Sequence, residues 1–468
     1  MKSKLSLSPI LGWFKNKWHI IAILGVILLL VRFRLTSDKD FLLSIGTEET
    51  VSYISASQIP LGTWEFFTSV RPFTIPILLK AMEPENGYRL DVVSRPAGVN
   101  KSYHRQAQQG FDQIVLTQVA FSILGWGALA VSVSRHLAKP ILKVLAVALI
   151  LMFAFSPPVA DWDSVLDSFS FTFSLLALLF ALLIEIAFWF PRGYERGKVK
   201  AGILIALWLA VTILFVFVRD SNQYILPVSA LFLFSLLLLR PMRSKVLPIL
   251  ILAFVVIVVF GFGLFTARKS TRWNNPLFHA YEHFVFPDKG RVAYFKVSFN
   301  MPEPNSSEFG EWFNREAPQA YLLLLLDGPR IVASELLSNM DIFLSENLQP
   351  YFHKSRRDYG LQLELVGNVL HPLSSVVFYA DLILLGGLCG ITLKTRASRP
   401  FTWLWLAGWW IVSASLILFV SYFFDTWGVI RHVVYSVQMY RLFFWIYLLV
   451  MIDLLLVYPL PSQAETAT

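Results

Sequence analysis

The sequence predicts an all-α membrane protein with about ten transmembrane helices and two large outer-face loops that contain short interfacial helices. Hydrophobic residues make up 56% of the 468 residues and charged residues only 15%, which is outside the range of soluble globular domains. Apolar stretches close to the length of a membrane helix recur along the chain. Short basic clusters lie between these stretches. We expect residues 1–468 to form a single polytopic membrane domain.

Ten apolar stretches approach the roughly 20 residues that a membrane helix needs. They are 14–32, 113–133, 141–158, 169–190, 201–218, 224–239, 246–266, 373–393, 401–422 and 442–459. The third and the sixth are short, as tilted or partly re-entrant spans can be. The first is followed by Arg32 and Arg34 and not by a small-residue cleavage site, which indicates an uncleaved signal anchor.

The orientation follows from the basic clusters. Seventeen basic residues and one acid, Glu195, lie in five short segments: Lys2, Lys4, Lys15 and Lys17; Arg135, Lys139 and Lys143; Arg192, Arg196, Lys198 and Lys200; Arg240, Arg243 and Lys245; Lys394, Arg396 and Arg399. With ten spans, all five segments fall on one side of the membrane, which the positive-inside rule makes the cytoplasm. We therefore expect a multi-pass protein of the cell (plasma) membrane, with both termini cytoplasmic.

Three longer segments and two short turns, 159–168 and 219–223, are then left outside. The first outer loop is 33–112, the second large outer loop is 267–372, and a shorter stretch covers 423–441. The cytoplasmic loops are too short for a nucleotide-binding domain, so chemistry is expected in the outer loops, with 33–112 as the catalytic one. The apolar run 320–326 is too short to span a bilayer and indicates a short interfacial helix. The basic residues form short clusters, which argues against a nucleic-acid partner.

The first outer loop begins with four carboxylates, Asp38, Asp40, Glu48 and Glu49. A carboxylate that is shielded from water at the membrane face can have a raised pKa and act as a general base on a hydroxyl group. The alternative is a solvated cluster at the start of a loop. These carboxylates, among them Asp40, Glu48 and Glu49, are the candidate catalytic residues.

Five arginines lie in the outer segments or at their ends, and their guanidinium groups can bind phosphate bidentately. They are Arg71, Arg219, Arg291, Arg431 and Arg441. The alternative partner for each is the headgroup of a membrane phospholipid. Arg219 is followed directly by Asp220, and an ion pair at the end of a span would be partly buried.

Metal binding has little support in the sequence. Residues 38–40 and 161–163 have Asp-x-Asp spacing, which binds a metal in soluble sugar-nucleotide enzymes. Matches of three residues are weak evidence for a metal site, so we expect neither a metal nor another cofactor. The alternative is a bound divalent metal. The single cysteine, Cys389, lies in an apolar run and leaves no disulfide framework or cysteine metal site.

Several short motifs resemble those of the GT-C superfamily of polytopic glycosyltransferases, particularly its bacterial integral-membrane members. In chain order they are Glu49-Thr-Val-Ser-Tyr53, Arg71-Pro-Phe-Thr-Ile-Pro76, the segment from Trp162 through Asp167 to Ser170, Arg219-Asp220-Ser-Asn222, Arg291-x-x-Tyr294-Phe295 with Met301-Pro302, and Ala320-Tyr321. The resemblance covers most of the chain. Two positions depart from the family pattern, because Glu49 stands where the family usually has Asp and Asp167 where Glu is usual.

The resemblance implies that the protein moves a sugar from a polyprenyl-phosphate donor to a glycan or lipid acceptor on the outer face. A carboxylate of the first outer loop would deprotonate the acceptor: Glu49 by its match to the family pattern, then Glu48 and Asp40. Basic outer residues would hold the lipid phosphate. The substrate-binding residues it implies are Tyr53, Arg71, Trp162, Asp167, Arg219, Asp220 and Arg291. Membrane lipids are the other expected partners.

Two other functions fit the same topology. A transporter or flippase of a lipid-linked glycan would need a polar cavity through the helix bundle. A non-catalytic assembly protein would use Glu49 and Asp167 only to cap helices. The sequence leaves both alternatives open.

Overall fold

The computed structural model of this chain describes residues 8–36, 44–90, 108–193, 198–238, 245–270, 272–345, 361–424 and 429–459. These segments are almost entirely helical, and the only β-structure within them is two isolated bridges, Ile45 with Val165 and Arg89 with Gln109. The predicted all-α membrane fold is confirmed.

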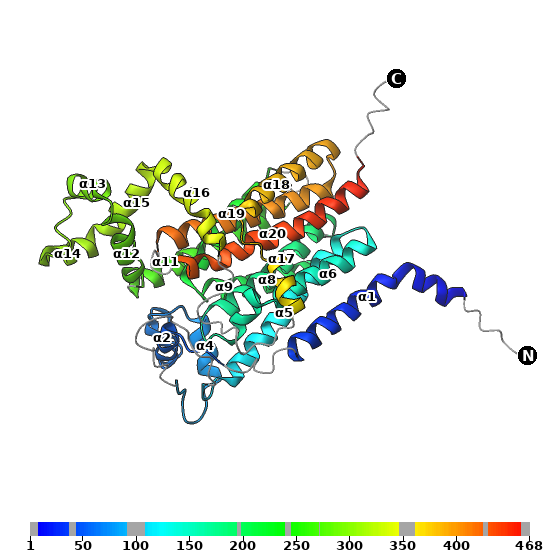
Figure 1. Ribbon diagram of the computed structural model, residues 1–468, viewed down its shortest axis with the longest axis horizontal. Coiled ribbons are helices and arrows are strands. Elements are labelled where there is room, and N and C mark those ends of the chain that lie inside the picture. The colour runs from blue at the N-terminus through cyan, green and yellow to red at the C-terminus, as the bar shows by residue number, and fades with distance from the viewer. Residues whose placement is uncertain are drawn as a thin grey trace, which may run out of the picture.

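Among the described residues, ten helices form the bundle (Figure 1). They are α1 Ser8–Thr36, α5 Asp112–His136, α6 Pro140–Phe155, α8 Phe169–Gly193, α9 Lys198–Val216, α10 Ile225–Leu236, α11 Val246–Lys269, α18 Val376–Thr395, α19 Ser398–Phe423 and α20 Val429–Val457. Each expected span overlaps one of these helices. In Figure 1, α1 lies at one edge of the bundle and α18 to α20 lie at the opposite edge.

The number of helices that could cross a membrane is smaller than the ten predicted. Among the described residues, eight helices are long and apolar enough, or nine if α6 and the bent segment Pro157–Ser164 form one broken span. The break follows α6, where α7 (Pro157–Ala160) leaves its direction by 54°. Helix α10 has only 12 residues, a length of about 18 Å against a hydrocarbon core of about 30 Å. A 3₁₀ turn, Asp220–Tyr224, precedes α10.

The core of the bundle is tightly packed, and its surface suits lipid. Helices α5 and α8 approach so closely that a Cβ atom on Gly125 would lie 2.3 Å from the Ser174 carbonyl oxygen. Trp403, Trp409 and Trp410 of α19 are almost completely buried. On α11, in contrast, large apolar side chains such as Phe254 are mostly exposed. An apolar surface of this kind is typical of helices that face lipid.

Two of the predicted cytoplasmic segments meet at one end of the bundle. Asp453 of α20 is completely buried and accepts hydrogen bonds from the backbone N–H groups of Ala138 and Lys139, at 2.9 and 2.8 Å. Arg399 forms an ion pair with Asp453 and donates to the His136 carbonyl oxygen at 2.7 Å. The connections α5–α6 and α18–α19 therefore lie together, as the predicted orientation requires. Which side of the membrane they face stays a prediction.

The first predicted outer loop lies at the other end of the bundle (Figure 1). Its described part contains three short helices, α2 Glu48–Ser57, α3 Trp64–Phe67 and α4 Thr74–Ala81. Ile45 is bridged to the segment before α8, since its N–H donates to the Ser164 carbonyl at 2.8 Å and its own carbonyl accepts from Leu166 at 2.9 Å. This bridge places the start of α2 beside the turn that leads into α8.

The part of the second predicted outer loop from Leu277 to Leu325 packs around its own apolar cluster, which includes Tyr281 and Tyr321. The described helices of the whole loop are α12 Asn274–Ala280, α13 Lys289–Phe299, α14 Ser307–Arg315, α15 Ala317–Asp327, α16 Pro329–Ser345 and α17 Leu361–Leu370, with a π-helical turn at Tyr281–Val285. Helix α15 contains the short apolar run that the sequence predicts as a helix. The Tyr321 hydroxyl donates to the Phe423 carbonyl at 2.6 Å and so ties α15 to the end of α19.

Candidate functional site

Glu49, in the first turn of α2, lies at the centre of a cluster of arginines. One carboxylate oxygen accepts from Arg71 at 3.2 Å, and the other forms an ion pair with Arg431 at the start of α20. Arg219 adds a third nearby positive charge. Burial would raise the pKa of Glu49, but Arg431, Arg71 and Arg219 together lower it below its usual value. Glu49 is therefore ionised and held between two guanidinium groups.

Arg71 is positioned by α2. Its Nε donates to the Ser52 hydroxyl at 2.7 Å, and its guanidinium lies over the ring of Tyr53, 4.7 Å from the centroid. Tyr53 itself is 1% exposed, so it acts as a platform below Arg71. The spacing of Glu49, Ser52 and Tyr53 on one helix brings all three to Arg71, since residues three and four apart share a helix face.

Arg219 follows α9 and lies on the other side of the cluster. It donates to Nδ1 of His432 and lies over the ring of Phe169, 4.3 Å from the centroid. Its Nη1 atom is buried and has no hydrogen-bond partner among the described residues. A buried, unpaired donor on a charged group is energetically unfavourable. This Nη1 is therefore a donor available to an incoming anion.

Asp167 lies just before α8 and is almost completely buried. Its Oδ1 accepts from the Phe169 N–H at 2.8 Å, so Asp167 caps the start of α8. Burial raises the pKa of Asp167 to about 7; the Phe169 hydrogen bond lowers it and the charge of Glu49 raises it further. A carboxyl group with a pKa near 7 is suited to proton transfer at neutral pH.

Two residues of the segment 161–170, Trp162 and Asp163, have structural roles. Trp162 is fully buried and packs on Phe169 with 4.3 Å between ring centroids, so its ring is not available to a substrate. Asp163, part of the second Asp-x-Asp motif, accepts from Arg34 of α1 at 3.1 Å and from the Ser170 hydroxyl at 2.8 Å. Asp163 therefore attaches α1 to the bundle.

The expected ion pair between Arg219 and Asp220 is wrong. Asp220 is paired instead with Arg272, which donates to its two carboxylate oxygens at 2.9 and 3.2 Å. Arg272 also donates to the Ser69 carbonyl at 2.8 Å. In an extended backbone, side chains of adjacent residues point in opposite directions, and Arg219 is extended, with φ −155° and ψ 140°. The pair therefore connects the 3₁₀ turn with the first loop.

Arg291 does not share a partner with the cluster around Glu49. Within the described residues, it pairs with Glu335 and Asp288 and donates to the Phe284 carbonyl at 2.8 Å, with its guanidinium over the Phe284 ring. These partners all belong to the second loop, so Arg291 stabilises that loop. Of the seven substrate-binding residues that the resemblance implies, Tyr53, Arg71, Asp167 and Arg219 lie around Glu49.

Other candidates are placed as follows. Asp40, with Asp38, falls in 37–43, outside the described residues. Glu48 begins α2, and its side chain is also outside them. Arg431 appears in the sequence as one of five outer arginines and proves to be a direct partner of Glu49. His432 and Arg272 were missed, because the sequence marks them only as polar residues at helix ends. Among the described residues, no three His, Cys, Asp or Glu side chains are placed to hold a metal ion.

The fold and this cluster define a class of protein, a multi-pass all-α membrane protein with an arginine and carboxylate site at one end of its helix bundle. No protein-family model and no curated protein match the chain.

Solved structures of the oligosaccharyltransferase AglB from Archaeoglobus fulgidus are among those that match. The complex with an inhibitory peptide and a dolichol-phosphate has a TM-score of 0.47 and 13% identity, covering 97% of this chain and 52% of that chain. The apo form has a TM-score of 0.48 at the same identity and coverage, and the complex with Zn and sulfate has 0.45 at 11% identity, covering 92% and 49%. The chain thus spans about half the length of these structures. At these TM-scores the match carries no conclusion about activity.

Proposed function

We propose that this protein is a glycosyltransferase that moves a sugar from a lipid-phosphate-linked donor to an acceptor hydroxyl group at the membrane surface. The observation that carries this proposal is the convergence of Arg71, Arg219 and Arg431 around Glu49, with a buried Arg219 N–H left unpaired. Guanidinium groups bind phosphate oxygens through short, charge-assisted hydrogen bonds. Three guanidinium groups beside one ionised carboxylate give the cluster a net positive charge.

The position of the cluster suits the phosphate of a lipid. Arg219 follows α9, Asp167 precedes α8, and Arg431 lies at the start of α20. All three therefore lie at ends of membrane helices, where lipid headgroups meet the hydrocarbon core. A polyprenyl phosphate could place its phosphate on the arginines while its tail stays in the bilayer. We assign this face to the outside, with 33–112 and 267–372 as its two loops, from the predicted orientation.

Sugar transfer requires a base for the acceptor and stabilisation of the leaving group. The acceptor oxygen forms a bond to the anomeric carbon while the bond from that carbon to the phosphate oxygen breaks. The arginines take up the negative charge of the departing lipid phosphate. In this proposal Asp167, with a pKa of about 7, accepts the proton of the acceptor hydroxyl. Glu49, already ion-paired, orients Arg71 and Arg431.

The sequence prediction that Glu49 is the base stays a competing prediction. Its pKa is lowered and both of its oxygens are occupied by arginines, so it would need to be released before it could accept a proton. A donor phosphate that draws Arg71 or Arg431 away would release it. Variants of both carboxylates therefore have to be compared.

The phosphate site can be tested with Arg219→Gln in the full-length protein, with Arg268→Gln as the control. Arg268 is an exposed residue in the last turn of α11, so its substitution removes the same charge outside the cluster. Loss of a hydrogen bond to a charged group costs about 1.5–3 kcal/mol, so Arg219→Gln should bind polyprenyl phosphate about 10- to 100-fold more weakly. The measurement is thermal stabilisation by polyprenyl phosphate against neutral polyprenol. Equal affinity in wild type and Arg219→Gln would refute the site.

The transfer itself can be tested in cells. Lipid extracts of a deletion strain should contain an acceptor glycan or lipid that lacks one sugar, and wild-type protein should restore it while Arg219→Gln should not. Restoration by Arg219→Gln at normal abundance would contradict the proposal. A complete acceptor that accumulates on the inner leaflet would favour the flippase alternative.

A further inference from the structure

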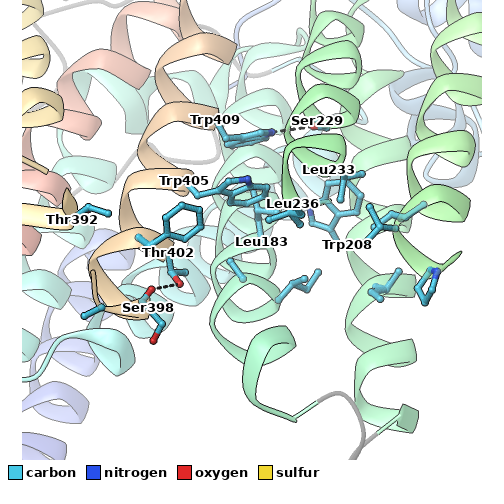
Figure 2. A pocket seen from close by; sticks show the side chains of 18 of the residues that line it. Leu183, Trp208, Ser229, Leu233, Leu236, Thr392, Ser398, Thr402, Trp405 and Trp409 are labelled. Atoms are coloured by element: carbon cyan, nitrogen blue, oxygen red, sulfur yellow. Dashed lines mark hydrogen bonds between the residues drawn. The ribbon is translucent and has the colours of Figure 1, made fainter. Parts of the chain in front are cut away.

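A cavity of about 530 Å³ lies within the helix bundle, away from the arginine cluster. Its walls come from α8, α9, α10, α11 and α19 and the end of α18, and they are mostly apolar. Figure 2 shows Trp409 with Ser229 at one end of the cavity and Ser398 with Thr402 at the other. The indole N–H groups of Trp409 and Trp405 are satisfied by the protein, since Trp409 donates to Ser229 at 3.1 Å and Trp405 to Ser235 at 3.2 Å. The walls thus offer an occupant mainly apolar contacts.

The cavity has the depth of one membrane leaflet. Ser398 and Trp409 are both on α19, 11 residues apart, which corresponds to about 16 Å along the helix axis. Half of a hydrocarbon core is about 15 Å thick. An apolar cavity of this size does not retain ordered water, and its surroundings contain acyl chains. Its shape therefore fits an acyl chain that enters from one leaflet.

The mouth of the cavity is cationic. Arg396 lines it and is exposed, and its side chain has no hydrogen-bond or ion-pair partner among the described residues. Its backbone is left-handed, with φ 50°, and caps α18 through a 2.9 Å hydrogen bond to the Thr392 carbonyl. Ser398 and Thr402 add hydroxyl groups beside it, and none of the described residues that line the cavity is acidic. A basic pocket between membrane helices is a typical site for an anionic lipid headgroup.

The cavity lies at the other end of the bundle from the arginine cluster. Arg396 and Ser398 precede Arg399, which is paired with Asp453 at the end of α20. On α9, the lining residue Ile205 is 14 residues before Arg219, which is about 21 Å along a helix. A phosphate bound at Arg396 therefore lies at the opposite end of the bundle from the arginine cluster, so the two sites are separate.

We propose that this cavity binds an anionic glycerophospholipid of the surrounding membrane, with an acyl chain along Trp405 and Trp409 and the phosphate on Arg396 and Ser398. The lipid fills the space between α9, α10 and α19 and stabilises the short helix α10, which is only 12 residues long. This inference does not depend on the proposed sugar transfer.

The test uses full-length protein purified in mild detergent, with the retained lipids extracted and quantified by mass spectrometry. The variants are Arg396→Gln at the mouth and Leu233→Trp, which fills the cavity. The matched control is Lys394→Gln, an exposed basic residue two positions from Arg396 that is not part of the lining. One basic residue at the membrane surface contributes about 1 kcal/mol to anionic lipid binding, so Arg396→Gln should retain about fivefold less anionic phospholipid. Lys394→Gln should retain the wild-type amount.

A second measurement keeps the proposal falsifiable if Leu233→Trp fails to fold. Phosphatidylglycerol should raise the thermal stability of wild type more than phosphatidylcholine does, and Arg396→Gln should lose this difference. Equal stabilisation of wild type by both lipids would overturn the proposal. So would an equal loss of lipid in Lys394→Gln, or a retained lipid that proves to be a polyprenyl phosphate.

Discussion

Asp167→Asn should separate activity from stability. Asparagine has the same shape and keeps an oxygen that accepts from the Phe169 N–H, but it cannot take up the acceptor proton. Loss of a positioned base typically lowers a rate about 10²- to 10⁴-fold. In wild type, a base with a pKa of about 7 is half ionised at pH 7 and about one-tenth ionised at pH 6. Sugar transfer by wild type should therefore fall about fivefold between these pH values.

The same substitution should make the protein more stable at high pH. The pKa of Asp167 rises from 3.8 to about 7 in the folded protein, so the folded state favours the protonated form. Its stabilising contribution is complete below the unfolded pKa and is lost as the pH rises through about 7. A shift of roughly three units corresponds to at most about 4 kcal/mol. The Asp167→Asn variant would have no such loss, because an amide does not ionise.

The assay is thermal unfolding of the purified protein from pH 5 to pH 8, together with sugar transfer in membranes at matched abundance. The control is Glu49→Gln. The pKa of Glu49 is lowered in the folded state, so its stabilising contribution is present above the unfolded pKa and is lost as the pH falls. Glu49→Gln should therefore be less stable than wild type at pH 8, where Asp167→Asn should be more stable. Full transfer activity in Asp167→Asn would refute the role of Asp167 as the base. If Asp167→Asn were less stable than wild type at pH 8, the argument that burial raises the pKa of Asp167 would be refuted.

Two further predictions concern the fold. Asp163→Ala should destabilise the protein by about 3–5 kcal/mol, because it leaves the buried Arg34 without its ion-pair partner. The thermal stability of Asp163→Ala should improve when Arg34→Met is added, and no improvement would contradict the pairing. Reporter fusions at Gly193 and Asn305 should report opposite sides of the membrane, as the basic segments predict, and the same side for both would refute the topology.

The helical membrane fold could be predicted from the sequence because it depends on local properties. A helix satisfies its own backbone hydrogen bonds, so an apolar run of sufficient length is enough to predict a membrane helix. Each expected span proved to be a helix for this reason. The lengths of α6 and α10 were less well predicted, since the bend after α6 and the 3₁₀ turn before α10 depend on how these segments pack on their neighbours.

The candidate site was predicted only in part, because ion pairs are made between segments far apart in the chain. Hydropathy and charge place Glu49, Arg71, Asp167, Arg219 and Arg431 in outer segments, but they do not say which side chains meet. Asp220 pairs with Arg272 and Arg291 pairs with Glu335, and no local pattern distinguishes these arginines from Arg71.

The sequence by itself determined the class of fold, the apolar helices and the basic segments between them, since each follows from the transfer of local segments between water and lipid. Only the tertiary structure decided which carboxylate is held by arginines and which is buried. Glu49 and Asp167 have the same ionisable group, yet Arg431 and Arg71 lower the pKa of one while burial raises the pKa of the other to about 7. These neighbours come from segments far apart in the chain, and the backbone bridge between Ile45 and Val165 brings the start of α2 beside the turn before α8.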